Sequence, residues 1–193
     1  MRVFLAGGSG VIGIRIIPLL VSAGHEVAAM TRSPDKAKPL QALGAKPVIC
    51  NVYDANALVE EVRGFGAQAV MHQLTDLPDD ASRIPEFGPA NSRIRREGTR
   101  NLIAAAQATG ATRFLAQSLA WSIAGDGGAA VDDLERAVLA IDGVVLRYGQ
   151  FYGPGTYFED SKPPPPRVQI DEAAQRTAVA LLDGSAGVVM ITE

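Results

Sequence analysis

Three glycines near the N terminus have the type and spacing needed to bind a phosphate group. The first, Gly7, ends the apolar stretch RVFLAG. It is followed by Gly10 and Gly13, which open a second apolar run. At this spacing one glycine permits a tight turn, one lets the backbone approach a pyrophosphate, and one lets helix and strand pack closely. The N terminus of the following helix adds free N–H groups and a partial positive charge. The pattern predicts a dinucleotide site that includes Val11 and Ile12, and a turn without a ligand is the weaker alternative.

The residues that end the second apolar strand bear on which dinucleotide binds. A fold that prefers NAD places Asp or Glu there to hold the ribose 2′-hydroxyl. Thr31, Arg32 and Ser33 stand there instead, and Glu26 comes too early in the strand. A guanidinium suits a 2′-phosphate, and Arg15 could assist. The sequence therefore favours NADP over NAD, with an exposed loop arginine as the alternative interpretation of Arg32.

Other reactive side chains are few. Cys50, in the apolar run KPVIC, is the only cysteine and is interpreted as a buried core residue, so we expect no intrachain disulfide and a reducing cytoplasm. His25 and His72 have no partner at metal-ligand spacing, so no metal site is expected. The net charge of −3 and the lack of a targeting segment or long apolar run predict neither nucleic acid nor membrane as a partner. Four arginines within residues 93–100 are interpreted as a solvated helix face.

Strand-like and helix-like stretches alternate along the whole chain. Strands are expected at residues 2–7, 25–31, 46–51, 67–74, 112–118, 143–149 and 187–192. Helices are expected from residue 9 or 10 to 23, from 34 or 35 to 44, and at 54–64, 91–109, 131–141 and 171–184, with Asp54 and Asp171 as N-caps. This order implies right-handed βαβ units and an α/β fold with a doubly wound parallel sheet. The length of 193 residues fits a single domain.

Several segments resemble the NAD-dependent epimerase/dehydratase branch of the short-chain dehydrogenase/reductase superfamily, which includes nucleotide-sugar epimerases and dTDP-glucose 4,6-dehydratases. GGSGVIG is similar to the glycine motif of that family, and NVYDANAL to its third-strand segment. EGTRNLIAAAQATGATRFLAQS, VVLRYGQFYGPGT and QIDEAAQRTAVALL resemble its later motifs. The resemblance implies a Rossmann-like NAD(P)-binding fold and a homodimer formed through the long helices of the GTRNL segment. It also divides the chain into a core (1–155), a shortened substrate region (156–168) and a final helix and strand (169–193).

The resemblance implies a catalytic serine at Ser118 and an acid beside the adenine at Asp54. In this family a tyrosine and a lysine four residues later exchange the proton as hydride moves. Counted back from Glu135, the lysine position falls at Val131 and the tyrosine position at Gly127, so both groups are missing. The stretch AGDGGAAV is too rich in glycine for the usual helix start, and we expect a shortened active-site loop there.

Two tyrosines are candidates to replace the missing acid. Tyr148 follows an arginine in the sixth strand, and Tyr152 belongs to the YGPG turn, while packing roles are the alternative for both. Arg95 stands near the position of an asparagine that is common in the family, and Leu74 completes the predicted cofactor-binding residues. The main hypothesis is an NADP(H)-dependent oxidoreductase acting on a small carbonyl or sugar-type substrate. The alternatives are a catalytically silent NADP(H)-sensing module that acts through a protein partner, and a decayed enzyme without a ligand.

Overall fold

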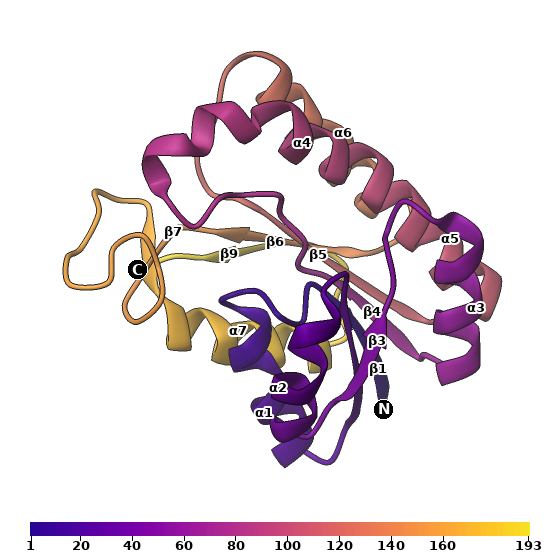
Figure 1. The fold of residues 1–193 in the computed structure, drawn as a ribbon. Helices are drawn as coiled ribbons and strands as arrows, with labels where there is room; N and C mark the ends of the chain where they lie inside the picture. The colour runs from indigo at the N-terminus through magenta and orange to yellow at the C-terminus, as the bar shows by residue number, and fades with distance from the viewer.

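A computed structural model describes residues 1–193 as a central sheet between two layers of helices (Figure 1). The sheet has seven strands, all parallel, in the order β3-β2-β1-β4-β5-β6-β9. They are β1 (Arg2–Ala6), β2 (Glu26–Thr31), β3 (Lys46–Ile49), β4 (Ala69–His72), β5 (Arg113–Leu119), β6 (Val144–Tyr148) and β9 (Gly187–Ile191). The doubly wound parallel sheet predicted from the sequence is confirmed.

Helices cover both faces of this sheet. On one face lie α1 (Gly13–Ser22), α2 (Ala37–Ala42) and α7 (Ile170–Leu182). On the other face lie α3 (Ala55–Phe65), α4 (Gly88–Arg93), α5 (Thr99–Thr109) and α6 (Gly125–Leu139). A second, two-stranded sheet pairs β7 (Gln150–Tyr152) with β8 (Arg167–Gln169) beside the C-terminal segment. None of the helices is both long and apolar enough to cross a lipid bilayer.

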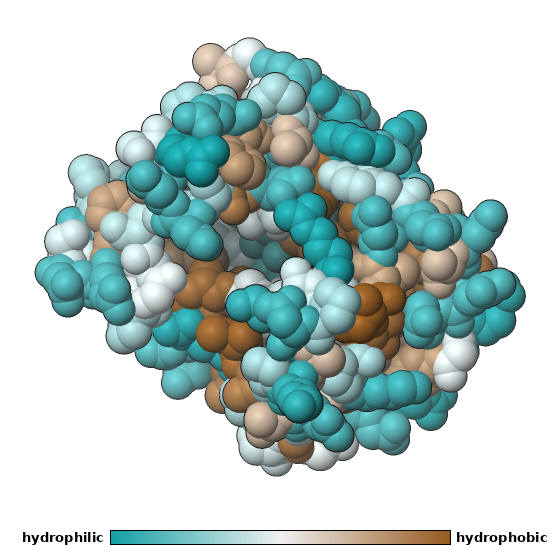
Figure 2. All heavy atoms as spheres, viewed as in Figure 1, coloured by the Kyte–Doolittle hydropathy of each residue, from teal (hydrophilic) through white to brown (hydrophobic).

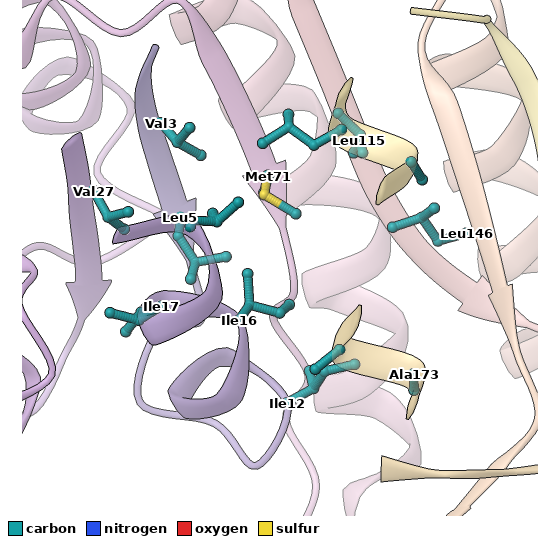
Figure 3. Close-up of a cluster of buried hydrophobic side chains, with 14 of the residues drawn as sticks. Val3, Leu5, Ile12, Ile16, Ile17, Val27, Met71, Leu115, Leu146 and Ala173 are labelled. Carbon is teal, nitrogen blue, oxygen red and sulfur yellow. The ribbon is translucent and has the colours of Figure 1, made fainter. Parts of the chain in front are cut away.

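Alternate residues of each strand pack against opposite layers, as β1 shows. Val3 and Leu5 belong to the cluster beneath α1 and α7, where they lie with Ile16 (Figure 3). Phe4 and Ala6 belong to the cluster on the opposite face. Because both faces are covered, the strand is apolar throughout, as is usual for buried parallel strands. Each large side chain buried in this way contributes about 1.5–3 kcal/mol, so the carboxyl ends of the strands are held on a stable frame.

The strand order fixes where a ligand can bind. From β1 the chain first proceeds outward to β2 and β3, and then returns to the other side of β1 to form β4. The connections after β1 and β4 therefore run to opposite sides, and they leave a crevice at the carboxyl ends of these two strands. Such a switch point is the usual ligand site of open α/β sheets.

The long helix expected at 91–109 differs in two ways from the sequence prediction. It begins three residues earlier, with α4 at Gly88, and it continues into α5 through a π-helical segment, Ile94–Gly98. A Cβ atom at Gly98 would lie 3.2 Å from the Ile94 side chain, so glycine allows close packing inside this wider turn. Segments of π-helix are frequent at functional sites, and this one borders the switch-point crevice through Ile94.

The expected loop over AGDGGAAV is wrong, because α6 already begins at Gly125 rather than at Val131. A Cβ atom at Gly128 would lie only 2.1 Å from the carbonyl oxygen of Ile123, and one at Gly127 would lie 3.1 Å from the Ile123 side chain. The glycines therefore let the preceding segment lie against the first turn of the helix. The helix-propensity cost of glycine, about 1 kcal/mol each, is outweighed by tertiary contacts.

The arginines of residues 93–100 do not form a single solvated face, so that interpretation is corrected. Arg93 is exposed and pairs with Glu97 at 2.7 Å. Arg96 reaches α6, where its guanidinium bonds Asp126 at 2.8 Å and a second aspartate at 2.7 Å. Arg95, in contrast, is only 9% exposed. The π segment thus turns neighbouring arginines toward different surroundings.

One of the two predicted helix caps is present. The Asp54 carboxylate accepts a hydrogen bond from the Ala57 N–H at 3.0 Å and caps α3. The predicted cap of the last helix is wrong: Gln169 occupies that position, and its side-chain oxygen accepts from the Asp171 N–H at 2.6 Å. Asp171 instead forms an ion pair with Arg15 of α1. This pair fastens the last helix to the first.

Both outer strands of the large sheet carry distinctive groups. β3 contains Pro47, which has no backbone N–H. At the opposite side, Arg176 of α7 donates hydrogen bonds to the Met190 carbonyl of β9 at 2.7 Å and to the Thr192 carbonyl at 2.8 Å. Val188 and Met190 on β9 remain about half exposed.

Candidate functional site

A cleft of about 250 Å³ opens at the carboxyl ends of β1, β2, β3 and β4. Figure 2 shows that hydrophilic side chains border a hollow on the face viewed there. Residues from the loop after β1, from the ends of β2, β3 and β4, and from the π segment line the cleft. Of the predicted cofactor-binding residues, those that line it are Gly7, Gly10, Thr31, Arg32, Ser33 and Leu74. The structure therefore brings together predicted residues that are up to 67 positions apart in the sequence, Gly7 and Leu74, and adds Ile94 to them.

The three glycines of the loop have separate structural reasons. Gly7 has a φ of +90°, and a Cβ atom there would lie 2.6 Å from the carbonyl oxygen of Gln73 on the adjacent chain segment. A Cβ atom at Gly13 would lie 2.3 Å from the Gly7 carbonyl oxygen, so this residue lets α1 pack on the loop. Gly10 lines the cleft, where the missing side chain leaves the backbone accessible. Gly7 therefore allows the turn, Gly13 the close packing of α1, and Gly10 the approach of a ligand to the backbone.

The N terminus of α1 supplies hydrogen-bond donors that the protein does not use. Ile12 occupies the N-cap position, where no side chain caps the helix. The N–H groups of Val11, Ile12 and Gly13 donate to no backbone carbonyl. Uncapped N–H groups and the helix dipole favour an anion at this position. The residues of the loop therefore fit the pyrophosphate of a dinucleotide, although Val11, Ile12 and Gly13 are not among the residues that line the cleft.

Charged side chains surround the other end of the cleft. Arg32, at the end of β2, bonds the Asp76 carboxylate through its Nη2 atom at 3.0 Å. Tyr53 forms part of the wall, and the Arg93 guanidinium lies 3.9 Å from the centre of its ring. Burial and then the nearby Asp76 charge raise the pKa of Tyr53. Sequence reasoning missed Asp76, because it lies in the loop after β4, 44 residues from Arg32.

Asp54, predicted beside the adenine, does not line the cleft. Its carboxylate is directed to the first turn of α3, where it accepts from Ala57. Asn51 lines the cleft instead, at the end of β3, and its side-chain oxygen accepts from the Tyr53 N–H at 3.1 Å. The predicted role of Asp54 in cofactor binding therefore has no contact in this structure that supports it.

Three hydrogen bonds from the Arg15 guanidinium hold it within the protein. Its Nε atom bonds Asp171 at 2.8 Å, and its Nη1 atom bonds the Val11 carbonyl at 2.7 Å. Its Nη2 atom bonds the Pro154 carbonyl at 2.5 Å. Arg15 thus joins the glycine loop to the YGPG turn and to α7. These contacts help to position the loop, and the predicted part of Arg15 in phosphate binding stays a prediction.

Ser118, the predicted catalytic serine, belongs to a buried network. Its hydroxyl donates to the Glu135 carboxylate of α6 at 2.5 Å, and Arg147 of β6 donates to the same carboxylate at 2.8 and 2.5 Å. Burial raises the pKa of Glu135, but the hydrogen bonds from Arg147 and Ser118 outweigh it, so the net pKa is lowered and the carboxylate stays ionised. The tyrosine and lysine positions, Gly127 and Val131, both lie on α6 and carry no titratable group.

Tyr148, the last residue of β6, is almost fully buried. Thr177 donates to the Ala173 carbonyl at 2.7 Å, so the Tyr148 hydroxyl donates to Thr177 at 2.6 Å and accepts from the Gln73 amide at 3.3 Å. Burial raises the pKa of Tyr148 far above its usual range, although the bonds to Thr177 and Gln73 act in the opposite direction. Its proton is directed away from Gln73, which is the group that lines the cleft.

Tyr152 lies on β7, away from the residues that line the cleft. Its hydroxyl donates to the Glu193 carboxylate, and the Lys162 ammonium lies 4.7 Å from the centre of its ring. Arg167 bonds the same carboxylate at 2.9 Å. These contacts fasten the C-terminal residue to the two-stranded sheet. They do not bring the Tyr152 hydroxyl to the cleft.

Arg95 is a charged residue whose structural surroundings could not be predicted from the sequence. Its side chain forms no ion pair and no hydrogen bond, and burial lowers its pKa. His72, at the end of β4, is fully buried, and its Nε2 atom lies 3.1 Å from the Thr99 hydroxyl. Burial and then the Arg95 charge lower the pKa of His72 to about 3, so its imidazole is neutral. A neutral histidine and an unpaired arginine thus lie close to the end of β4.

A sequence profile described as NAD(P)H-binding matches residues 7–124. The match extends over more than half of the chain and includes the glycine loop, the cleft and the π segment. The chain belongs to the NAD(P)H-binding family. The predicted binding of a dinucleotide is thereby confirmed at the level of NAD(P), without a distinction between NAD and NADP.

Among the relatives, 3-diazoavenalumate denitrifying reductase of Streptomyces sp is 35% identical over 180 residues, which cover 81% of this chain and 58% of the relative. Sterol-4-alpha-carboxylate 3-dehydrogenase (decarboxylating) of Dictyostelium discoideum is 37% identical over 86 residues, 45% of this chain and 26% of the relative. The chain therefore spans less than two thirds of the length of these relatives.

Among solved structures, the UDP-glucose 4-epimerase of Thermus thermophilus in complex with NAD has a TM-score of 0.81 at 19% identity. The alignment covers all of this chain and 78% of that one. The resemblance to the epimerase/dehydratase branch is thereby confirmed for the fold.

Proposed function

We propose that this protein is an NADP(H)-dependent oxidoreductase that acts on a small carbonyl-bearing substrate. The observation that carries the proposal is the pairing of an uncapped glycine-loop helix with Arg32 at the end of β2, both beside one cleft. The names of the relatives, a reductase and a dehydrogenase, support a redox role. They give no support to a silent module that acts through a protein partner.

The glycine loop and the cleft beside it divide the dinucleotide between them in this proposal. In this proposal the free N–H groups of Val11, Ile12 and Gly13 bind the pyrophosphate, because they have no partner within the protein. Arg32 binds the 2′-phosphate, since two thirds of its side chain is exposed and its guanidinium suits that geometry. Leu74, on the wall between them, packs against the adenosine. The bound cofactor supplies the hydride.

Proton transfer in this proposal does not pass through Tyr148 or Tyr152. The Tyr148 hydroxyl donates to Thr177, and the Tyr152 hydroxyl donates to Glu193, so neither has a proton directed to the cleft. Ser118 donates to Glu135 and orients that carboxylate. Water supplies the proton, and the protein accelerates reduction chiefly by placing cofactor and substrate together.

The segment 156–168 contributes the substrate side of the site in this proposal. It leaves the YGPG turn, and the Tyr157 hydroxyl donates to the Pro78 carbonyl in the loop after β4. Two loops that belong to different parts of the sequence are thus joined near the cleft residues that end β4. A segment this short is suited to a small substrate rather than to a nucleotide sugar.

Calorimetric titration with NADPH, NADH and NADP⁺ tests the cofactor part of the proposal. We expect NADPH to bind more tightly than NADH. Arg32→Ala should raise the dissociation constant of NADPH at least tenfold and should change that of NADH little. Arg136→Ala is the matched control, because this exposed arginine lies on α6 and pairs only with Asp133. Equal binding of NADPH to wild type and Arg32→Ala would show that Arg32 does not hold the phosphate.

A panel of aldehydes and ketones, followed by NADPH absorbance, tests the activity. Oxidation of NADPH that depends on one of these substrates is the expected result. Tight cofactor binding without turnover on any of them would refute the oxidoreductase assignment.

A further inference from the structure

The ion pair between Arg32 and Asp76 crosses the cleft from one wall to the other. Arg32 comes from the end of β2, and Asp76 from the loop after β4, on the far side of β1. The two partners differ in exposure: 67% of the Arg32 side chain is accessible, but only 15% of the Asp76 side chain. The arginine can therefore change partner readily, whereas the carboxylate is enclosed.

The backbone holds Asp76 in place independently of its carboxylate. The Asp76 N–H donates to the side-chain oxygen of Asn91 at 3.3 Å, and Asn91 is buried in α4. The carboxylate itself has one hydrogen-bonding partner, the Arg32 Nη2 atom at 3.0 Å. A substitution that removes only the charge should therefore leave the loop in position.

The pair combines two groups that normally serve different cofactors. A guanidinium at the end of β2 accommodates a 2′-phosphate, whereas an acid holds the 2′-hydroxyl of an unphosphorylated ribose. Here the acid is absent from the end of β2, but Asp76 brings a carboxylate to the same guanidinium from the loop after β4. A phosphate bound by Arg32 would meet a second negative charge a few ångströms away, and like charges at that distance repel. A ribose hydroxyl could donate to the same carboxylate.

We propose that Asp76 is a specificity-determining residue that sets the preference between NADPH and NADH. Its carboxylate competes with the 2′-phosphate for Arg32 and accepts from the 2′-hydroxyl when no phosphate is present. The inference rests on the proposed function, in which Arg32 binds the phosphate. It adds that the phosphate binds only after Arg32 has exchanged its partner.

The test measures dissociation constants of NADPH and NADH by calorimetry for wild type, Asp76→Asn, Arg32→Ala and the double variant. Asp76→Asn should lower the dissociation constant of NADPH at least fivefold. The dissociation constant of NADH should stay unchanged or rise. In the Arg32→Ala background the same substitution should tighten NADPH binding less than it does in wild type, because only the charge repulsion remains to be relieved. An equal gain in both backgrounds would refute the competition for Arg32. Asp79→Asn is the control, because it removes the same charge from the same loop and makes no contact with Arg32.

The outcomes separate this inference from the proposed function. If Arg32→Ala weakens NADPH but Asp76→Asn leaves the ratio of the two constants unchanged, the role of Asp76 is refuted and the proposed function stands. If Asp79→Asn gives the same gain as Asp76→Asn, the effect comes from the charge of the loop and the role of Asp76 is again refuted. If no variant binds either dinucleotide, the proposed function fails and this inference fails with it. Thermal unfolding of each variant shows that it is folded.

Discussion

Gly13 is the first residue of α1, and its missing side chain makes room for the backbone of the glycine loop. A Cβ atom at this position would lie 2.3 Å from the Gly7 carbonyl oxygen and 2.8 Å from that of Gly8. Both obstacles are backbone atoms, and Gly7 is held in a turn with a φ of +90°. Gly13→Ala must therefore push helix and loop apart.

The magnitude follows from two opposing contributions. Alanine in a helix is favoured over glycine by about 1 kcal/mol. Forcing a methyl group into a closely packed site costs about 1–3 kcal/mol, and backbone obstacles favour the upper end. We expect Gly13→Ala to lower the free energy of unfolding by about 1–2 kcal/mol. For a chain of this length that corresponds to a fall in Tm of about 2–8 °C.

The assay compares Gly13→Ala with Gly64→Ala in urea unfolding followed by circular dichroism. Gly64 lies exposed inside α3, and a Cβ atom there would meet nothing within 4 Å. Alanine at that control position should stabilise the protein by about 0.5–1 kcal/mol. Gly13→Ala should also weaken the binding of NADPH more than tenfold, because the free N–H groups of Val11, Ile12 and Gly13 move with the loop. Gly64→Ala should leave this binding unchanged. Stabilisation of Gly13→Ala to the extent of the control would refute the packing argument.

Three further predictions concern the groups around the cleft. Glu135→Gln removes the ionised partner of Arg147, so the free energy of unfolding should fall by about 1–3 kcal/mol at pH 7. Since the pKa of Glu135 is lowered in the folded state, this difference from wild type should shrink as the pH falls through that pKa. A constant difference between pH 7 and pH 3 would contradict the prediction. His72 should stay neutral in proton NMR titrations down to about pH 4, because its pKa is about 3. A His72 midpoint near 6 would be inconsistent with its burial. The contribution of neutral His72 to stability is present above about pH 6.5 and is lost as the pH falls toward 3. Tyr148→Phe should lower the free energy of unfolding by about 1 kcal/mol, because it removes one buried hydrogen bond. It should leave kcat for NADPH oxidation within threefold of wild type. A hundredfold loss of kcat would instead identify this tyrosine as the proton donor.

The order of strands and helices could be predicted because it depends on local patterns. Each strand of the sheet is an apolar run, and helices with polar faces separate these runs. The start of α6 could not be predicted in the same way. Gly127 and Gly128 are typical of loops, and only the approach of the Ile123 carbonyl, which follows from the tertiary structure, explains them within a helix.

The candidate site divides along the same line. The glycine loop is contiguous in the sequence and its role follows from local spacing, so its position beside the cleft was predictable. The partners of its charged neighbours were not. Arg32 meets Asp76 44 residues away, and Arg15 meets Pro154 139 residues away. Such contacts depend on how the loops after β4 and β7 run, and no short motif encodes that course.

The two outer strands of the sheet have a consequence for association between chains. An unprotected outer strand offers a row of unpaired N–H and carbonyl groups to which a strand of another molecule can be added, the first step toward aggregation. Pro47 removes a donor from the β3 edge, and the Arg176 guanidinium covers carbonyls along the β9 edge. Both edges of the sheet thus carry a group that hinders the addition of a further strand, and at the β9 edge this group lies beside the exposed apolar surface of Val188 and Met190.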